Sequence, residues 1–206
     1  MPNGLGDPKS EAIPGMVIAL MGMPGSGKST AAKWLSLELD LDFLDLDDEI
    51  CSRASRSVPE LFADLGEEAF RALEFEVLKE LLGRTRPKSA ILALGGGTAV
   101  ADERGVEVLR GSANTVYLWA TPALLAEALN DSNEQAKRPL LQGSDLMSRV
   151  SQLYEQRHLR YLGLADYVLG PDLSWEELCG RLRELVVSIL PGQSAPACDP
   201  MVRSQS

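Results

Sequence analysis

The sequence predicts an α/β fold in which a five-stranded parallel sheet is flanked by helices. Two observations lead to this prediction. Strand-like and helix-like segments alternate along the chain, as they do where parallel strands are joined through helices. In addition, the first strand-like segment runs through a glycine-rich loop directly into a helix-like segment, and its apolar run is typical of a strand buried on both faces of a sheet.

The expected elements follow from short apolar runs and from apolar residues at helical spacing. Strands are expected at 16–21, 42–45, 89–94, 114–119 and 166–169. Helices are expected at 28–39, 47–55, 59–64, 66–83, 102–110, 122–129, 145–162 and 174–190. Residues 1–14, with three prolines and two glycines, are expected to form a flexible leader, and the Pro-, Ser- and Gln-rich residues 191–206 a flexible tail. A single domain is therefore expected at 15–190.

The first strand leads into a phosphate-binding motif. Residues 22–30 read Gly-Met-Pro-Gly-Ser-Gly-Lys-Ser-Thr and match G-x-x-x-x-G-K-[ST] at each fixed position. Backbone N–H groups of the loop and the helix dipole are expected to surround phosphate oxygens. Lys28 would neutralise the β- and γ-phosphates of a nucleoside triphosphate, and the Ser29 hydroxyl would bind Mg²⁺. The candidate nucleotide-binding residues are Gly25, Ser26, Gly27, Lys28, Ser29 and Thr30. A glycine turn without a ligand is the alternative, and the flanking strand and helix count against it.

Acidic residues follow the second strand. Because strand side chains alternate, Asp45 and Asp47 are expected on one face of the sheet, about 7 Å apart. One carboxylate would reach Mg²⁺ and the other a substrate hydroxyl; the alternative is that they only cap the next helix, as Asp48 and Glu49 are expected to do. The strand at 89–94 ends without the Asp that many phosphate-loop enzymes use for magnesium, which assigns the metal to Asp45.

The third strand runs into Gly95, Gly96 and Gly97. Ligands of open parallel sheets bind beyond the carboxyl ends of the strands, where this turn is expected to lie. Three glycines let a ligand approach the backbone closely and expose N–H donors to it. A simple flexible turn is the alternative.

A lid is expected at about 122–141, because residues 130–138 are polar and show little hydrophobic patterning. The segment ends in Arg-Pro-Leu-Leu at 138–141, where the proline would end the lid and the leucines would anchor it. If the lid closes, Arg138 would stabilise the charge of a transferring phosphoryl group, an effect worth about 10³–10⁵ in rate for arginine fingers. Without the phosphate-binding motif, a solvated charged loop would be the better interpretation.

Two arginines stand where an apolar residue would normally face inward. Arg71 and Arg157 each share helical spacing with apolar residues of their own helix. Such an arginine either extends to water or pairs with an anion in a cleft, and for Arg71 alone the first explanation is the better one. Glu68 and Glu74 are expected to hold the Arg71 guanidinium. Two such arginines in an acidic protein indicate a small carboxylate ligand held by bidentate hydrogen bonds.

Composition excludes several classes of partner. The net charge of −10 argues against nucleic acid and anionic membranes, which need a basic surface. No apolar run is long enough to span a membrane and no signal peptide opens the chain. Cys51, Cys179 and Cys198 lack paired spacing and are expected to be reduced, which favours the cytoplasm. A monomer is expected, and the single histidine, His158, is expected to face solvent without a role.

These motifs, in this order, resemble the shikimate kinase family. The matching segments cover roughly residues 16–190 and lie at 22–30, Phe-Leu-Asp-Leu-Asp 43–47, Gly-Glu-Glu-Ala-Phe-Arg-Ala-Leu-Glu 66–74, Gly-Gly-Gly 95–97, Arg-Pro-Leu-Leu 138–141 and Arg157…Tyr161…Ala165. The resemblance implies a P-loop, nucleoside-monophosphate-kinase-like fold with a mobile lid. It also implies phosphorylation of the 3-hydroxyl of shikimate by ATP with Mg²⁺, in the chorismate pathway of aromatic amino acid biosynthesis.

For the acceptor, the resemblance implies that Asp47 binds the shikimate hydroxyl as base or orienting group. Arg71 and Arg157 would clamp the shikimate carboxylate. The backbone at 95–97 would contact the ring hydroxyls.

For the nucleotide, the resemblance implies that Lys28 and Arg138 contact the ATP phosphates, so that the catalytic residues are these two and Asp47. Ser29 would bind Mg²⁺ directly, and Asp45 would do so through water.

The chain departs from the family in the lid. Members often carry a second Arg about seven residues before Arg-Pro-Leu-Leu, near the adenine, whereas Asn130 and Asp131 occupy that region here, with Lys137 as a partial substitute. The loop at 170–174 also lacks basic residues. Two alternatives follow: a kinase for another small hydroxy acid such as gluconate, since gluconate kinases share Phe-Leu-Asp-x-Asp-Asp, and a catalytically silent ligand-binding domain.

Overall fold

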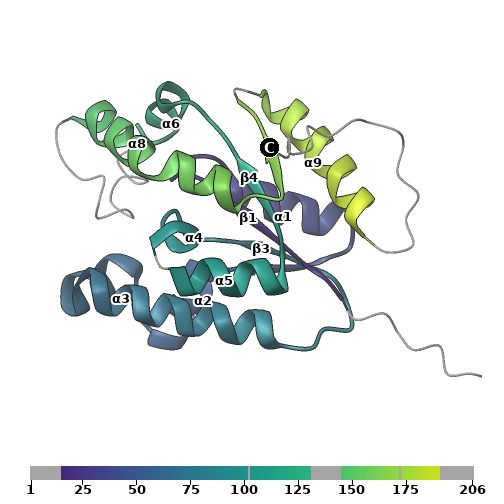
Figure 1. The fold of residues 1–206 in the computed structure, drawn as a ribbon, viewed down its shortest axis with the longest axis horizontal. Helices are drawn as coiled ribbons and strands as arrows, with labels where there is room; N and C mark the ends of the chain where they lie inside the picture. The colour runs from purple at the N-terminus through teal and green to yellow at the C-terminus, as the bar shows by residue number, and fades with distance from the viewer. Residues whose placement is uncertain (1–14, 102, 131–144, 172, 191–206) are drawn as a thin grey trace, which may run out of the picture.

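Five parallel strands form the centre of the molecule, in the order β2-β3-β1-β4-β5 (Figure 1). The structure is a computed structural model that describes residues 15–101, 103–130, 145–171 and 173–190. The strands are β1 (Val17–Met21), β2 (Asp42–Asp45), β3 (Ala90–Ala93), β4 (Asn114–Leu118) and β5 (Tyr167–Leu169). Each strand lies within one residue of its expected bounds, and every pairing is parallel. The predicted fold class is confirmed.

The helices are α1 (Lys28–Glu38), α2 (Leu46–Ala54), α3 (Val58–Gly83), α4 (Thr98–Ala101), α5 (Glu103–Ser112), α6 (Pro122–Ala128), α8 (Leu146–Leu164) and α9 (Trp175–Ile189). Two of them differ from expectation. The helices expected at 59–64 and 66–83 form the single element α3, kinked at Gly66, whose φ of 76° lies in the left-handed region that glycine tolerates. The short helix α4 follows the triple glycine and was not expected, because a single helical turn has too few residues to show a periodic pattern.

Two hydrophobic clusters hold the helices against the two faces of the sheet. The residues of β1 alternate between them: Val17, Ala19 and Met21 join one cluster, and Ile18 and Leu20 join the other. The first cluster includes side chains of α3, α5 and α8, and the second those of α1 and α9. Figure 1 shows α1 and α9 together, away from α3 and α5. All five residues of β1 are buried, which explains why its apolar run is unbroken.

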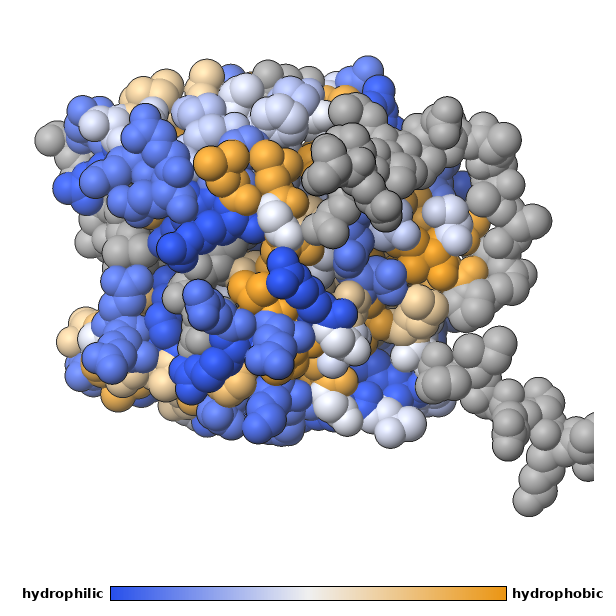
Figure 2. Space-filling model, viewed as in Figure 1, coloured by the Kyte–Doolittle hydropathy of each residue, from blue (hydrophilic) through white to orange (hydrophobic). Residues whose placement is uncertain are grey.

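The central position of β1 determines where the loops gather. This strand pairs with β3 on one side and β4 on the other, and β2 and β5 form the sheet edges. The carboxyl ends of all five strands therefore meet at one edge of the sheet, where the loops that follow them form the candidate site. Hydrophilic residues cover much of the face seen in Figure 2, with apolar residues in smaller areas between them. Within the described ranges, no helix is long and apolar enough to cross a membrane.

Some predictions lie outside the described residues. These are the leader at 1–14, the tail at 191–206, and most of the lid, including Arg138, Lys137 and Asp131. Of the expected lid, the structure describes α6 and the residues up to Asn130.

Candidate active site

The phosphate-binding loop connects β1 to α1. Gly27 is the N-cap of α1. Its φ of 80° lies in the left-handed region, which residues other than glycine rarely adopt. Lys28 is 6% exposed, and its ammonium group donates to the carbonyls of Gly22 (3.0 Å) and Met23 (2.9 Å). The cation is therefore folded back over the loop, at the positive end of the helix dipole. Both features suit the binding of an anion.

Asp45 organises the end of β2. Its Oδ1 accepts from the backbone N–H groups of Asp47 (3.0 Å) and Asp48 (3.4 Å), which makes it the N-cap of α2. The prediction that Asp45 and Asp47 share one face of the sheet was wrong, because β2 ends at Asp45 and Asp47 lies in the first turn of α2. Asp45 itself, not Asp48 or Glu49, is the N-cap residue. The Asp45 carboxylate satisfies two backbone N–H groups that have no partner within the helix, and so fixes the start of α2 directly after the strand.

Ser29 and Asp45 have the donor chemistry that Mg²⁺ needs. The Ser29 hydroxyl donates to Asp45 Oδ2 (2.6 Å), so its proton is directed to the carboxylate and its oxygen lone pairs remain available to a cation. Burial, and then the nearby Asp45 carboxylate, raise the pKa of Asp48. The described residues contain no group of three or more His, Cys, Asp or Glu side chains suited to a metal. Mg²⁺ needs only one or two carboxylates when phosphates and water complete its shell, so the residues present fit this ion.

The turn at 95–97 touches the predicted acceptor residues. A Cβ added to Gly95 would lie 2.8 Å from an Asp47 carboxylate oxygen and 2.9 Å from a Glu74 carboxylate oxygen. One added to Gly97 would lie 2.7 Å from Nη2 of Arg71. A side chain at either position would have to displace these charged groups, so glycine lets them lie close to the backbone of the turn. The turn is closed by a hydrogen bond from the N–H of Thr98 to the Gly95 carbonyl (3.3 Å) and leads into α4.

Arg71 is held by two carboxylates on its own helix. Its Nη1 lies 2.6 Å from Glu74, which is almost fully buried, and its Nη2 lies 3.6 Å from Glu67. The expected partner Glu74 is confirmed, whereas Glu67 takes the place expected for Glu68. Thr98 also donates to Glu74, which ties the helix to the glycine turn. The side chain of Arg71 is only 15% exposed. The explanation that Arg71 extends to water, which the sequence alone favoured, is therefore wrong.

Arg157 approaches the same turn from α8. Its Nη1 donates to the Gly96 carbonyl (2.8 Å), and the hydroxyl of the fully buried Tyr161 donates to the same oxygen (2.6 Å). Burial lowers the pKa of Arg157, and the positive charge of Arg71 acts in the same direction. Two cations that face one turn repel each other, and an anionic group bound between them would relieve that repulsion.

Tyr161→Phe is expected to lower the free energy of unfolding by about 0.5–1.5 kcal/mol, the usual net value of a buried hydrogen bond. The variant keeps the ring, which stacks on Tyr117 at 5.1 Å, and removes only the donor to Gly96. Urea denaturation followed by circular dichroism measures the change. A variant as stable as the wild type would mean that Arg157 alone satisfies the Gly96 carbonyl.

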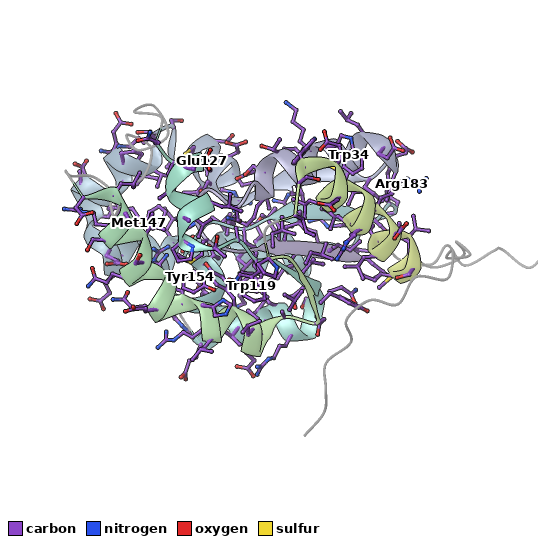
Figure 3. The ribbon with its side chains drawn as sticks, turned by 90° about the horizontal axis from the view of Figure 1, so that it is seen from above. Trp34, Trp119, Glu127, Met147, Tyr154 and Arg183 are labelled. Atoms are coloured by element: carbon purple, nitrogen blue, oxygen red, sulfur yellow. The ribbon has the colours of Figure 1, made fainter. Side chains whose placement is uncertain are left out.

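The expectation that His158 faces solvent was wrong. Its Nδ1 lies 3.0 Å from the Tyr117 hydroxyl, and its ring stacks on Tyr154 at 4.6 Å. Burial lowers the pKa of His158. In Figure 3, Tyr154 lies beside Trp119, whose indole Nε1 donates to the Tyr154 hydroxyl (2.8 Å). The signal was present in the sequence, because Tyr154, His158 and Tyr161 follow one another at helical spacing.

A cavity of about 610 Å³ brings together most of the predicted site. The predicted residues that line it are Gly25, Gly27, Lys28, Ser29, Thr30, Asp45, Asp47 and Gly96. Arg71 and Arg157 do not line it and lie against the turn at 95–97 instead. Sequence reasoning missed Cys51 and the residues at 57–59, which also line the cavity. The turn after α2 places the start of α3 at the wall of this cavity, and no local sequence pattern predicts that position.

A second cavity, of about 450 Å³, adjoins the first along the phosphate-binding loop. The two share Gly25, Gly27 and Ala128. The other walls of the second cavity come from the ends of β4 and β5, from α6 and from the start of α9, and most of their side chains are apolar. A polar, acidic cavity and an apolar one therefore meet at a phosphate-binding loop.

This fold and this site define a P-loop kinase that acts on a small molecule. The family model for shikimate kinase matches residues 24–186. The chain is 38% identical to the shikimate kinase of Deinococcus radiodurans, over 89% of each chain, and 36% identical to that of Chlorobium limicola, over 84% of this chain and 86% of the relative. The chain belongs to the shikimate kinase family.

Other relatives agree with this assignment. The chain is 42% identical, over 146 residues, to a bifunctional shikimate kinase/3-dehydroquinate synthase of Thermotoga maritima, and the match spans 27% of that longer protein. Among solved structures, the shikimate kinase of Acinetobacter baumannii in complex with shikimate superposes with a TM-score of 0.76 at 30% identity, covering 85% of this chain and 94% of that one.

Proposed function

We propose that the protein transfers the γ-phosphoryl group of ATP to the 3-hydroxyl of shikimate, giving shikimate 3-phosphate and ADP. The observation that carries the acceptor assignment is the approach of Arg71 and Arg157 to the glycine turn beside Asp47. Two partly buried guanidinium groups suit one carboxylate, and a neighbouring carboxylate suits a hydroxyl. Shikimate carries a carboxylate and several hydroxyl groups on one ring. The kinship with proteins named shikimate kinase supports the same acceptor.

The ATP phosphates would lie on the loop at 22–30, with Lys28 against the β- and γ-phosphates. Ser29 would bind Mg²⁺ directly and Asp45 would do so through water; the ion, when bound, neutralises charge on the phosphate oxygens. The nucleoside would then extend into the apolar cavity beyond Gly25 and Gly27.

Asp47 would orient the acceptor hydroxyl and accept its proton. The hydroxyl oxygen forms a bond to the γ-phosphorus as the bond from that phosphorus to the β–γ bridging oxygen breaks, and ADP leaves with the electron pair. Little covalent chemistry falls to the protein, so rate enhancement comes from positioning and from charge stabilisation by Lys28. Arg138, in the lid, would add a second cation against the transferring group.

The product provides the direct test of the reaction. Incubation with MgATP and shikimate should yield a product heavier by one phosphoryl group, and ³¹P–¹H correlation should place that group on the 3-position. Phosphorylation at another hydroxyl would mean that Asp47 orients the ring differently. If the protein binds the nucleotide but shikimate is recovered unmodified, the protein would be a ligand-binding domain without kinase activity.

Arg157→Ala is expected to raise the KM for shikimate by about 10- to 100-fold, since hydrogen bonds to charged groups contribute about 1.5–3 kcal/mol. The KM for ATP should stay near the wild-type value, because the residue contacts the turn at 95–97 and not the phosphate-binding loop. Arg149→Ala, an exposed arginine of the same helix, is the matched control. Normal shikimate affinity in the first variant would refute the clamp.

We also propose that the protein is a cytoplasmic monomer without nucleic acid or membrane partners, organised as one domain at 15–190 whose lid spans about 122–141. The net charge of −10 supports the absence of a polyanionic partner. Light scattering at micromolar concentration tests the monomer.

A further inference from the structure

One face of α8 carries four side chains that make contacts outside the helix. They are Tyr154, Arg157, His158 and Tyr161. Their spacing of three or four residues places them side by side on the helix. Arg157 and Tyr161 donate to the Gly96 carbonyl. His158 contacts aromatic rings instead, and it directly follows the arginine assigned to the carboxylate clamp.

His158 lies at the centre of an aromatic cluster. Its ring stacks on Tyr154, with 4.6 Å between centroids and 13° between planes. It also lies 5.1 Å from the Trp119 ring and 5.8 Å from the Tyr117 ring. Figure 3 shows Tyr154 and Trp119 close together. Because Tyr117 is a fully buried residue of β4, the 3.0 Å contact of its hydroxyl with His158 Nδ1 ties α8 to the sheet.

The contact between His158 and Tyr117 is a hydrogen bond between neutral groups. Burial lowers the pKa of His158 and raises the pKa of Tyr117, so both side chains favour their uncharged forms. The Tyr117 hydroxyl then donates to Nδ1, and the imidazole carries its proton on Nε2. A neutral imidazole also adds no further positive charge beside Arg157.

Tyr117 holds α8 at two points, close to the arginine. Besides its hydrogen bond to His158, its ring stacks on Tyr161, at 5.1 Å and 21°. A rotation of α8 that broke the contact of His158 would also move Arg157, because adjacent residues of a helix turn together. An arginine whose direction is fixed before a carboxylate arrives loses less side-chain freedom on binding.

We propose that His158 is a positioning residue of the acceptor site, whose hydrogen bond with Tyr117 fixes the rotation of α8 and so directs Arg157 to the acceptor carboxylate. The inference rests on the proposed function, which supplies shikimate as the acceptor. His158 acts through Arg157 and needs no contact with either substrate.

The first test measures shikimate affinity by calorimetry, which needs no turnover. His158→Phe keeps an aromatic ring and removes Nδ1, and it should weaken shikimate binding about three- to tenfold, with unchanged ADP affinity. Tyr117→Phe removes the other half of the hydrogen bond, so the double variant should lose no more than His158→Phe alone. Leu159→Phe is the control, because Leu159 is the next residue and is 74% exposed. Wild-type shikimate affinity in His158→Phe would overturn the proposal.

The second test asks whether His158 acts through Arg157. In an Arg157→Ala background, His158→Phe should cause no further loss of shikimate affinity, because the side chain that it positions is gone. A further loss as large as that in the wild-type background would contradict positioning, since the histidine would then act independently of the arginine.

The third test uses the fact that His158 is the only histidine of the chain. Labelling histidine with ¹⁵N therefore gives the NMR signals of one imidazole. The expected signals are those of the tautomer protonated on Nε2, and Tyr117→Phe should shift them. A mixture of tautomers that Tyr117→Phe leaves unchanged would overturn the proposal.

The same measurements separate this proposal from the proposed function. Protein that binds shikimate in the expected pattern but does not phosphorylate it would refute the kinase activity and leave the role of His158 standing. Wild-type protein that binds no shikimate would refute both.

Discussion

Asp47→Asn is expected to lower kcat by about 10²–10⁴, the usual contribution of a positioned general base, with unchanged ADP affinity. The variant keeps the shape of the side chain and the backbone hydrogen bond from Asp47 to Asp45, so α2 should start at the same residue. What it removes is the negative charge beside the glycine turn and the ability to take the hydroxyl proton. Steady-state kinetics with saturating substrates give kcat, and calorimetry gives the ADP affinity.

Asp48→Asn is the matched control for this experiment, because Asp48 lies in the same helical turn and lines the same cavity. It should lose far less activity, since no glycine of the turn approaches its carboxylate in the way Gly95 approaches that of Asp47. A kcat of Asp47→Asn equal to that of the wild type would remove Asp47 from the mechanism. Equal losses in both variants would indicate that the charge of the whole acidic turn matters, and not one carboxylate.

Lys28→Met is expected to lower kcat/KM for ATP by about 10²–10³, the range found when one preorganised donor to a developing charge is removed. Lys28 holds its ammonium over the loop through the carbonyls of Gly22 and Met23, so little reorganisation is needed when phosphates bind. Methionine fills a similar volume without the charge. A coupled assay at varied ATP and saturating shikimate measures the loss.

Lys33→Met, an exposed lysine on the same helix, is the control for a general change in charge. It should behave like the wild type. A Lys28→Met variant with normal kcat/KM for ATP would show that the loop backbone and Mg²⁺ carry the phosphate charge without the lysine.

Local sequence was enough to predict the strand, loop and helix that carry the phosphate-binding motif. The strand, the loop and the start of α1 are contiguous, so each residue's role follows from its position in one motif. Asp45 was also placed correctly at the end of its strand. The shared sheet face expected for Asp45 and Asp47 was wrong, because the alternation of strand side chains was extended past the end of β2 into the helix expected at 47–55. The N-cap hydrogen bonds of Asp45 mark where that helix begins.

For the acceptor site, the sequence predicted which residues take part but not how they are arranged in space. Arg71 and Arg157 belong to helices far apart in the sequence, and their approach to one turn depends on how α3 and α8 pack around the sheet. The partners of each arginine, Glu67 and Glu74 for one and the Gly96 carbonyl for the other, follow from that packing. The contact of His158 with Tyr117 shows the same limit, since it crosses from a helix to a strand, whereas its stacking on Tyr154 follows from spacing within one helix.

The central claim, that this site phosphorylates shikimate, is tested most directly by ADP release from MgATP measured side by side with shikimate, with gluconate and with no acceptor. Release that requires shikimate is the predicted result, because the paired arginines and Asp47 then act on the acceptor they fit. Release with gluconate alone would leave the phosphate-binding loop in place and contradict the arginine clamp. Bound ATP without release under any condition would contradict the proposed activity itself.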